Sequence, residues 1–218
     1  MRVTDPRAVA KLLVSTVDGP LDETLVSMVA SSGCLLKGHF RLQSGLHSPY
    51  FLRFGQLTFR QADADKIAAL FVALVQPPID GLVVLGAETS ARYLASALGR
   101  VMGTPVVLAK VDERRRPTTD FTDEKALEKA RGMLIATDIL TTGESVRPLV
   151  NVAQKFGNLE WVRLIAFATL EPGGHARVFQ RLAVDGHCLL QARWAITSPN
   201  DCELCQAGTE LVPAFEFV

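Results

Sequence analysis

The stretch MLIATDILTTGES, residues 133–145, decides the fold. Its first half is an apolar run typical of a buried strand, and Asp138 stands near the end of that run. A turn rich in hydroxyl side chains follows, and the apolar spacing of residues 144–156 predicts a helix after it. Because free N–H groups at a helix start attract anions, this order predicts a phosphate site. The alternative is a capped helix whose hydroxyls only satisfy free amides.

Three further apolar runs predict buried strands. They are GLVVLGA from Gly81, TPVVLAK from Thr104 and VRLIAFATL from Val162. Amphipathic stretches at residues 61–75 and 89–102 predict helices between them. Strands that alternate with helices favour an α/β fold with a parallel sheet covered on both faces.

Composition indicates one compact domain that acts on a small molecule. The chain has 218 residues, of which 48% are hydrophobic, enough to bury a full core. Its 23 basic and 23 acidic residues balance, so no overall field favours nucleic acid or an anionic membrane. The sequence holds no apolar run long enough for a membrane span or a leader, so we expect a soluble, cytoplasmic protein with reduced thiols.

Three segments lie outside the predicted strand and helix pattern. Residues 38–57, rich in aromatic and turn-forming side chains, predict a small N-terminal hood or an irregular edge. The charged segment 111–129 predicts a long mobile loop that closes over a ligand, or else a solvated loop with a helical second half. Residues 171–218 are expected to form a C-terminal extension.

Two motifs carry a resemblance to a known family. Asp138, followed by ILTTG, resembles the phosphoribosyl diphosphate motif of the type I phosphoribosyltransferases. The N-terminal region resembles the signature of the orotate phosphoribosyltransferases at Phe40, Leu42, Ser44, Gly45, Ser48, Pro49, Tyr50, Phe51 and Gly55. The resemblance covers most of residues 30–170. It implies a central parallel sheet flanked by helices, with a hood to which residues 1–57 contribute.

The resemblance also implies roles for particular residues. It assigns Asp138 to the ribose hydroxyls and places Lys110 among the catalytic cations of the loop. Magnesium would bind mainly to the diphosphate, and the neighbouring chain of a homodimer would help to build the site. The loop at residues 86–90 would receive pyrophosphate, Tyr50 and Phe51 would line the base pocket, and Thr141, Thr142, Gly143, Glu144 and Ser145 would hold the 5-phosphate.

The sequence departs from the family around the diphosphate. Thr137 replaces the first acidic residue of the motif, and Ala109 stands where an arginine is usual. Glu88 brings a negative charge to the loop for pyrophosphate, unless it points outward at a helix start. The cations that could compensate are Arg114, Arg115 and Arg116. An arginine fork differs in shape from a lysine ammonium, so the exchange alters geometry.

Further departures concern the base. Ala168 and Thr169 occupy the position where an Asp-Arg pair is expected, and Gln43 stands where a lysine is common. An unpaired carboxylate is costly to desolvate, so orotate itself is doubtful as a substrate.

Three functions fit this pattern. The first is an enzyme that transfers ribose 5-phosphate from phosphoribosyl diphosphate to a nucleobase-like acceptor. The second is a binding module for phosphoribosyl diphosphate or a nucleotide that has lost efficient catalysis. The third is an orotate phosphoribosyltransferase whose loop aligns differently.

The cysteines offer a weak zinc candidate. Cys202 and Cys205 form one C-x-x-C motif, and His187 and Cys188 precede it as possible further ligands. Adjacent ligands such as His187 and Cys188 suit one tetrahedral ion poorly, which favours a reduced cysteine pair. The remaining histidines, His39, His47 and His175, support no nucleophilic triad in the sequence pattern.

Overall fold

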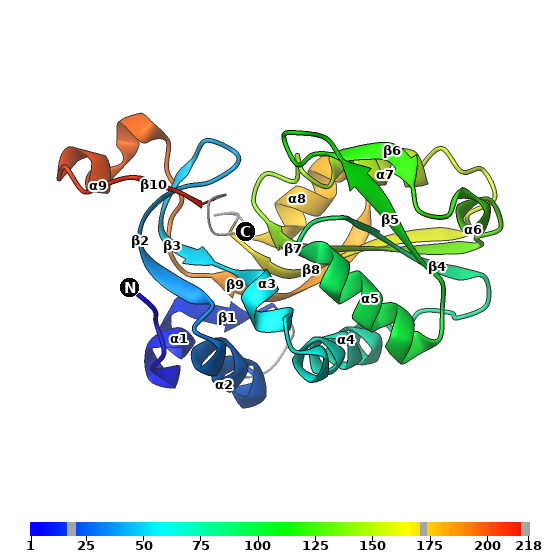
Figure 1. Ribbon diagram of the computed structural model, residues 1–218, viewed down its shortest axis with the longest axis horizontal. Coiled ribbons are helices and arrows are strands. Elements are labelled where there is room, and N and C mark those ends of the chain that lie inside the picture. The colour runs from blue at the N-terminus through cyan, green and yellow to red at the C-terminus, as the bar shows by residue number, and fades with distance from the viewer. Residues whose placement is uncertain (17–20, 171–173, 215–218) are drawn as a thin grey trace.

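A seven-stranded sheet forms the centre of the molecule, in the order β1-β9-β8-β7-β4-β5-β6. The computed structural model describes residues 1–16, 21–170 and 174–214 (Figure 1). The sheet strands are β1 (Leu13–Ser15), β4 (Leu82–Ala87), β5 (Val106–Val111), β6 (Pro117–Phe121), β7 (Gly132–Leu140), β8 (Trp161–Thr169) and β9 (Asp185–Ala192). The five middle strands are parallel, whereas β1 and β6 are antiparallel edges.

The predicted parallel sheet is therefore confirmed. The four apolar runs form β4, β5, β7 and β8. The helices between them are α4 (Gln61–Val75), α5 (Ala91–Met102) and α7 (Arg147–Ala153), and only α7 is much shorter than its apolar spacing indicated. The other helices are α1 (Pro6–Leu12), α2 (Glu23–Ser32), α3 (Phe54–Thr58), α6 (Glu124–Glu128) and α8 (His175–Leu182).

Strand residues alternate between two buried clusters, as expected for a sheet covered on both faces. Val84, Leu134 and Ile165 face a cluster that includes residues of α2, α4 and α5. Their neighbours Leu85 and Ile135 face a second cluster formed with α6, α7 and α8. Figure 1 shows α4 and α5 on the same side of the long strands. No helix in the described ranges has the length and apolar character needed to cross a bilayer.

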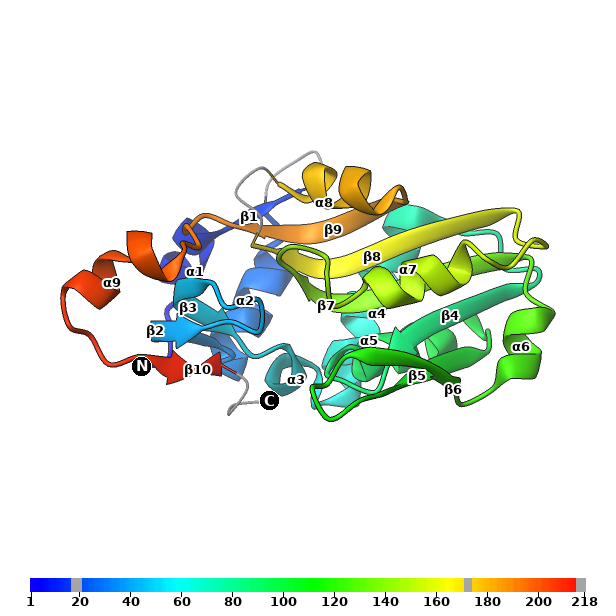
Figure 2. The same ribbon diagram turned by 90° about the horizontal axis from the view of Figure 1, so that it is seen from above.

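The hood is a separate three-stranded sheet that shares a core with the rest of the molecule. Strands β2 (Leu35–Arg41) and β3 (His47–Leu52) are antiparallel, and β10 (Val212–Pro213) pairs in parallel with β2. Phe40, Leu52 and Phe54 lie in the same buried cluster as α4 and α5. Figure 2 shows the hood beside one end of the long strands β7 and β8.

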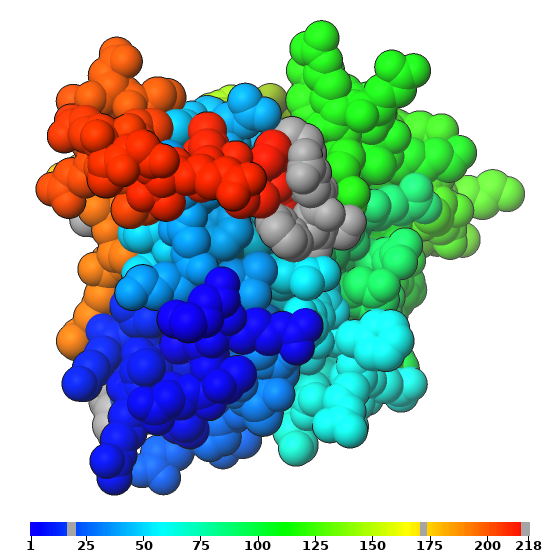
Figure 3. Space-filling view, turned by 60° about the vertical axis from the view of Figure 1, so that its left-hand side comes forward, coloured from blue at the N-terminus to red at the C-terminus, as the bar shows by residue number. Residues whose placement is uncertain are grey.

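The segment after Leu170 is divided between the central sheet and the hood. Strand β9 pairs with β8 from Asp185 onward, so this part belongs to the central sheet and not to an appendage. Beyond it, a 3₁₀ turn η1 (Pro199–Asp201), helix α9 (Glu203–Gln206) and β10 lie on the hood. Figure 3 shows this last segment, orange to red, lying across the blue hood.

The segment expected to be a long mobile loop forms an ordered hairpin in the structure. Strands β5 and β6 pair antiparallel, with a register shift between Ala109 and Val111. In the turn between them, the Asp112 carboxylate accepts hydrogen bonds from the backbone N–H groups of Arg114 and Arg116, 2.9 and 2.8 Å long. The helical second half that the sequence left open is the short helix α6.

Candidate functional site

A cavity of about 1090 Å³ lies where the hood meets the carboxyl ends of β4, β7 and β8. Ligand sites of open α/β sheets occur at such strand ends. Figure 3 shows a notch in this region between the hood and the green part of the chain. Five regions of the sequence contribute to its lining: residues 42–44, 51–56, 87–93, 113–117 and 136–146. The structure thus brings both sequence motifs to one cavity.

The predicted phosphate loop follows β7 at the cavity wall. Thr141, Thr142, Glu144 and Ser145 line the cavity, as predicted for a ligand-binding loop. Helix α7 begins only at Arg147, so the loop is a turn and not the first turn of the helix. Within the described residues, no hydrogen bond is donated by the backbone N–H groups of Thr141, Thr142, Gly143 or Ser145. Free N–H groups in a short turn form an anion-binding concavity.

Gly143 fixes the shape of this turn from behind. Its backbone has φ +82°, and a Cβ there would lie 2.8 Å from Val178 Cγ1 on α8. It is buried and does not line the cavity, unlike the loop residues around it. On the same side, an Arg181 N–H donates to the Thr142 carbonyl at 3.2 Å. Gly143 therefore lets the turn approach α8 closely. Its role is to set the backbone shape of the turn and not to contact a ligand.

Asp138 lies on the cavity wall at the end of β7. Its Oδ2 accepts a hydrogen bond from the Ser90 hydroxyl, and its Oδ1 accepts one from the Ile139 N–H at 2.8 Å. The Thr137 hydroxyl stands 3.5 Å from the same Oδ1, at the limit of a hydrogen bond. These donors fix the carboxylate in one orientation. They also connect the motif strand to the loop after β4, from which Ser90 comes.

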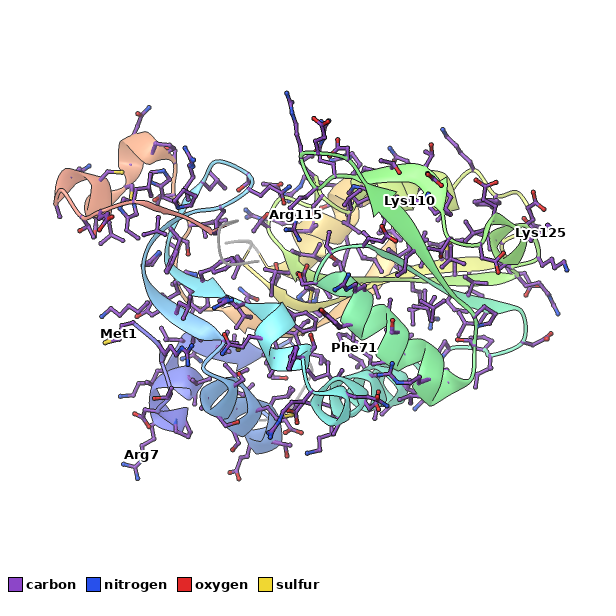
Figure 4. The ribbon with its side chains drawn as sticks, in the orientation of Figure 1. Met1, Arg7, Phe71, Lys110, Arg115 and Lys125 are labelled. Carbon is purple, nitrogen blue, oxygen red and sulfur yellow. The ribbon has the colours of Figure 1, made fainter. Side chains whose placement is uncertain are left out.

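The tip of the β5–β6 hairpin covers the other side of the cavity. Arg114, Arg115 and Arg116 all line it. The Gln43 side-chain N–H donates to the Arg114 carbonyl at 3.1 Å, so the hood loop contacts the hairpin tip. Arg116 is paired with Asp112 at 2.8 Å, whereas the guanidinium groups of Arg114 and Arg115 form no ion pair among the described residues. Figure 4 shows Arg115 on the part of the hairpin nearest the hood.

Lys110 lies outside the cavity of its own chain. Its ammonium forms an ion pair with Asp120 across the hairpin, 2.9 Å long, and both side chains are more than half exposed. The hydrogen bond that Lys110 donates to the Asp120 carboxylate, and then the negative charge of that carboxylate, raise the pKa of Lys110. Ala109, its neighbour on the strand, is fully buried, because successive strand residues face opposite sides. The structure therefore does not bring Lys110 to the predicted phosphate site.

The same alternation separates the two predicted base-pocket residues. Phe51 lines the cavity, but Tyr50 does not. The Tyr50 ring packs against Trp194 with ring centroids 5.0 Å apart. Of the two residues predicted for the base pocket, Phe51 therefore lines the cavity and Tyr50 packs away from it, and their role toward a base stays a prediction.

The end of β8 contributes an apolar residue to the cavity. Leu170 lines it, whereas Thr169 is fully buried and lies outside the lining. The cavity-lining residue at the end of β8 is therefore Leu170, one residue after the Ala168–Thr169 position considered in the sequence. Arg53, which follows the hood strand β3, also lines the cavity, and no sequence motif pointed to it. The sequence feature that could have pointed to Arg53 is its place directly after the residues of strand β3.

Glu88 lies at the cavity rim and is exposed. Its negative charge contributes, after Asp120, to the raised pKa of Lys110. The Glu88 backbone N–H donates to the Ala109 carbonyl at 2.9 Å and is not available to a ligand. The loop at residues 86–90 thus offers a ligand chiefly the side chains of Thr89 and Ser90.

The weak zinc candidates meet different partners from those expected. Cys202 and Cys205 face His39 and His47 of the hood, away from the cavity lining. Cys188 is buried in β9 and, like His187, is absent from this cluster. The predicted partners are therefore wrong, because β9 belongs to the central sheet while the C-x-x-C motif lies on the hood.

Comparisons with known proteins agree with the fold. No protein-family model matches the sequence. The chain is 26% identical over 192 residues to an orotate phosphoribosyltransferase of Heliobacterium modesticaldum, covering 87% of this chain and 95% of the relative. It is 28% identical over 194 residues to that of Chlorobium phaeobacteroides, covering 84% and 90%.

A solved structure supports the fold. The orotate phosphoribosyltransferase of Aeropyrum pernix superposes with a TM-score of 0.57 at 19% identity, covering 74% of this chain and 88% of that chain. The chain thus has the type I phosphoribosyltransferase fold, and the predicted resemblance to orotate phosphoribosyltransferases is confirmed.

Proposed function

We propose that this orotate phosphoribosyltransferase-like chain binds 5-phosphoribosyl 1-diphosphate and transfers its ribose 5-phosphate to a nucleobase-like acceptor. In that reaction the bond from ribose C1 to the diphosphate oxygen breaks, and a bond from C1 to a ring nitrogen of the base forms. Its similarity to enzymes of this class over most of its length supports the proposal.

One observation carries the proposal. The turn at residues 141–145 lies in the same cavity wall as Asp138, and within the described residues the backbone N–H groups of Thr141, Thr142, Gly143 and Ser145 donate no hydrogen bond. The turn suits a phosphate, because backbone N–H groups and a tight glycine turn surround an anion without needing a charged side chain. Asp138, held by Ser90 and by its neighbour's N–H, suits the hydroxyls of the attached sugar. Together they fit a ribose 5-phosphate.

The cations for the diphosphate would come from the hairpin tip. Arg114 and Arg115 line the cavity opposite the phosphate loop and have unpaired guanidinium groups within the described structure. Positive groups fixed around the leaving diphosphate stabilise the charge that develops as the bond to ribose breaks. We assign this role to the two arginines, and not to Lys110 of the same chain, because Lys110 is paired with Asp120 outside the cavity.

Magnesium is compatible with the residues present. Mg²⁺ typically binds one or two protein carboxylates together with substrate phosphates and water. Asp138 offers one ordered carboxylate on the cavity wall, next to the proposed ribose site. When bound with the diphosphate, the ion would neutralise part of its charge.

The base would lie against Phe51 and Leu170. These side chains line the cavity beyond the phosphate loop and offer an apolar surface for a flat ring. The side-chain amide of Gln43 donates to the Arg114 carbonyl of the hairpin. Neither Gln43 nor Leu170 carries a charge. We therefore infer an acceptor less acidic than orotate, because neither of these residues offers a cation to an anionic base.

A homodimer remains part of the proposal. Lys110 on the β5–β6 hairpin is exposed and lies outside the cavity of its own chain, so in this proposal it would serve the cavity of a neighbouring chain. Light scattering at micromolar concentration should give twice the mass of one chain, and a monomer would contradict this.

A second candidate function is a binding module without efficient turnover. The observations that favour it are the single motif carboxylate, with Thr137 beside Asp138, and the removal of Lys110 from the cavity by Asp120. One experiment separates the two functions. Labelled phosphoribosyl diphosphate and magnesium are incubated with orotate, uracil, adenine and related bases, and nucleotide and pyrophosphate are measured. The enzyme forms both products in equal amounts with one base or more, whereas a binding module retains the label unchanged.

A further inference from the structure

We propose that His39, His47, Cys202 and Cys205 form a structural zinc site that attaches the C-terminal segment to the hood. The two histidines come from the paired strands β2 and β3. Cys202 directly precedes the short helix α9 and Cys205 lies within it, more than 150 residues later in the chain. The proposal does not depend on the proposed function, because none of the four residues lines the cavity.

The distances are close to those around one tetrahedral ion, and small shifts of the side chains would complete the tetrahedron. Zinc bonds of 2.0–2.3 Å in a tetrahedron place the ligand atoms about 3.3–3.8 Å from one another. In the structure His39 Nε2 lies 3.1 Å from His47 Nδ1, 3.3 Å from Cys202 Sγ and 3.7 Å from Cys205 Sγ. Cys205 Sγ lies 3.3 Å from His47 Nδ1, and all four ligand atoms lie within 4.8 Å of one another.

The groups behind the ligands prepare them for a metal. His39 Nδ1 lies 2.9 Å from the Thr209 carbonyl, which accepts only an N–H, so Nε2 keeps its lone pair toward the cluster. The site is therefore more than two cysteines near two histidines, because a backbone carbonyl also orients one of the histidines.

Four protein ligands leave no open position. Catalytic zinc sites usually keep one position for water or substrate, whereas sites with four Cys and His ligands are structural. His39, His47 and Cys202 are buried, and only Cys205 is exposed. The arrangement thus suits an ion that joins chain segments and takes no part in the reaction.

The C-terminal segment needs such a link because it buries little. Between residues 199 and 214 only Cys202 and Ala214 are buried, and η1 and α9 are three and four residues long. Segments too small to build a core are commonly held by a metal or a disulfide. Zinc here would anchor the segment beside β2, with which β10 pairs from Val212. Ala214, just beyond β10, lines the cavity, so the link also shapes its wall.

The test measures metal in the purified, reduced protein. Cells are grown with added zinc, and metal content is determined by plasma mass spectrometry. We expect about one zinc per chain in the unmodified protein and less than about a tenth in Cys202→Ser and Cys205→Ser. His187→Gln and Cys188→Ala, which change the alternative ligands suggested by the sequence, should keep about one zinc.

Cobalt gives a second readout that does not require the variants to fold. Co²⁺ added to the metal-free, reduced protein should show the strong visible bands of a tetrahedral site and the sulfur-to-metal charge-transfer band. Removing the metal should speed protease cleavage at residues 206–211 at least tenfold, while the central sheet stays resistant. The proposal is overturned if the reduced protein takes up neither Zn²⁺ nor Co²⁺, if Cys202 and Cys205 are instead joined as a disulfide, or if only the His187 and Cys188 variants lose the metal.

Discussion

Replacing Gly143 by alanine tests how the phosphate loop obtains its shape. The left-handed backbone at φ +82° costs an alanine about 1–2 kcal/mol. The new Cβ would also lie 2.8 Å from Val178 Cγ1 and 3.2 Å from Leu182 Cδ1, so α8 must move. Overpacking of this kind costs about 1–3 kcal/mol. We expect the free energy of unfolding to fall by about 2–5 kcal/mol, which a domain of ordinary stability tolerates.

The variant should also lose phosphate binding, because the N–H groups of the turn move when the backbone relaxes. Urea unfolding gives the stability change, and calorimetry with phosphoribosyl diphosphate gives the affinity, which should fall at least tenfold. Gly157→Ala is the matched control, since a Cβ there meets no atom within 4 Å. Adding Val178→Ala should restore part of the stability by removing the contact, but not the backbone cost. If Gly143→Ala keeps the stability and affinity of the unmodified protein, the role of the turn is misassigned.

Three further predictions follow from the cavity. Arg115→Met should weaken the binding of phosphoribosyl diphosphate about tenfold. Lys110→Met should change the affinity less than about twofold in titrations at low protein concentration. A larger loss of affinity in Lys110→Met than in Arg115→Met would place Lys110 in the site. Orotate should bind about ten- to a hundredfold more weakly than the preferred base, because Leu170 and Gln43 offer its carboxylate no cation, and turnover with a micromolar Michaelis constant for orotate would refute this. Burial, and then the charge of a neighbour, lowers the pKa of both His175 and His187, so the unfolded chain binds more protons near pH 6. Stability should therefore fall as pH drops below about 6.5, and His187→Gln should reduce that slope in denaturant titrations; an unchanged slope would exclude His187 as a cause.

Much of the fold could be predicted because its strands are buried on both faces. The runs that became β4, β7 and β8 are nearly continuous apolar sequence, which only a covered parallel sheet requires. Strand β9 was missed because Asp185, Gly186 and His187 interrupt the pattern at its start, where the strand is more exposed. Strand β10 has two residues, too few for any periodicity.

The parts of the candidate site that are consecutive in the chain could be predicted from the sequence. The parts that depend on which side chains of a strand face the cavity could not. Asp138 lies near the end of β7 and the phosphate loop follows this strand directly, so the prediction of the strand located both. The base side depends on which residue of β3 or β8 faces inward, and a shift of one residue reverses that direction. Tyr50 and Thr169 lie outside the cavity lining for this reason, and Leu170 and Arg53 were missed.

The zinc ligands could not be assembled from sequence. His39 and His47 lie more than 150 residues before the C-x-x-C motif, and tertiary contacts such as the pairing of β10 with β2 and the bridge between His47 and Thr197 bring the two ends together. The nearer residues His187 and Cys188 were the natural partners by spacing, but they lie in the central sheet. Here tertiary contact, and not local pattern, determines the ligand set.

The central claim is that the turn at residues 141–145 and Asp138 bind a ribose 5-phosphate group. Calorimetry with phosphoribosyl diphosphate and magnesium tests it most directly. Thr142→Val removes one hydroxyl at nearly constant shape and should weaken binding about ten- to a hundredfold, while Thr24→Val, on the exposed side of α2, should leave it unchanged. Asp138→Asn should weaken phosphoribosyl diphosphate but leave inorganic phosphate unaffected. If neither phosphoribosyl diphosphate nor any ribose 5-phosphate binds the unmodified protein at millimolar concentration, the turn is a plain connection between β7 and α7 and the claim is wrong.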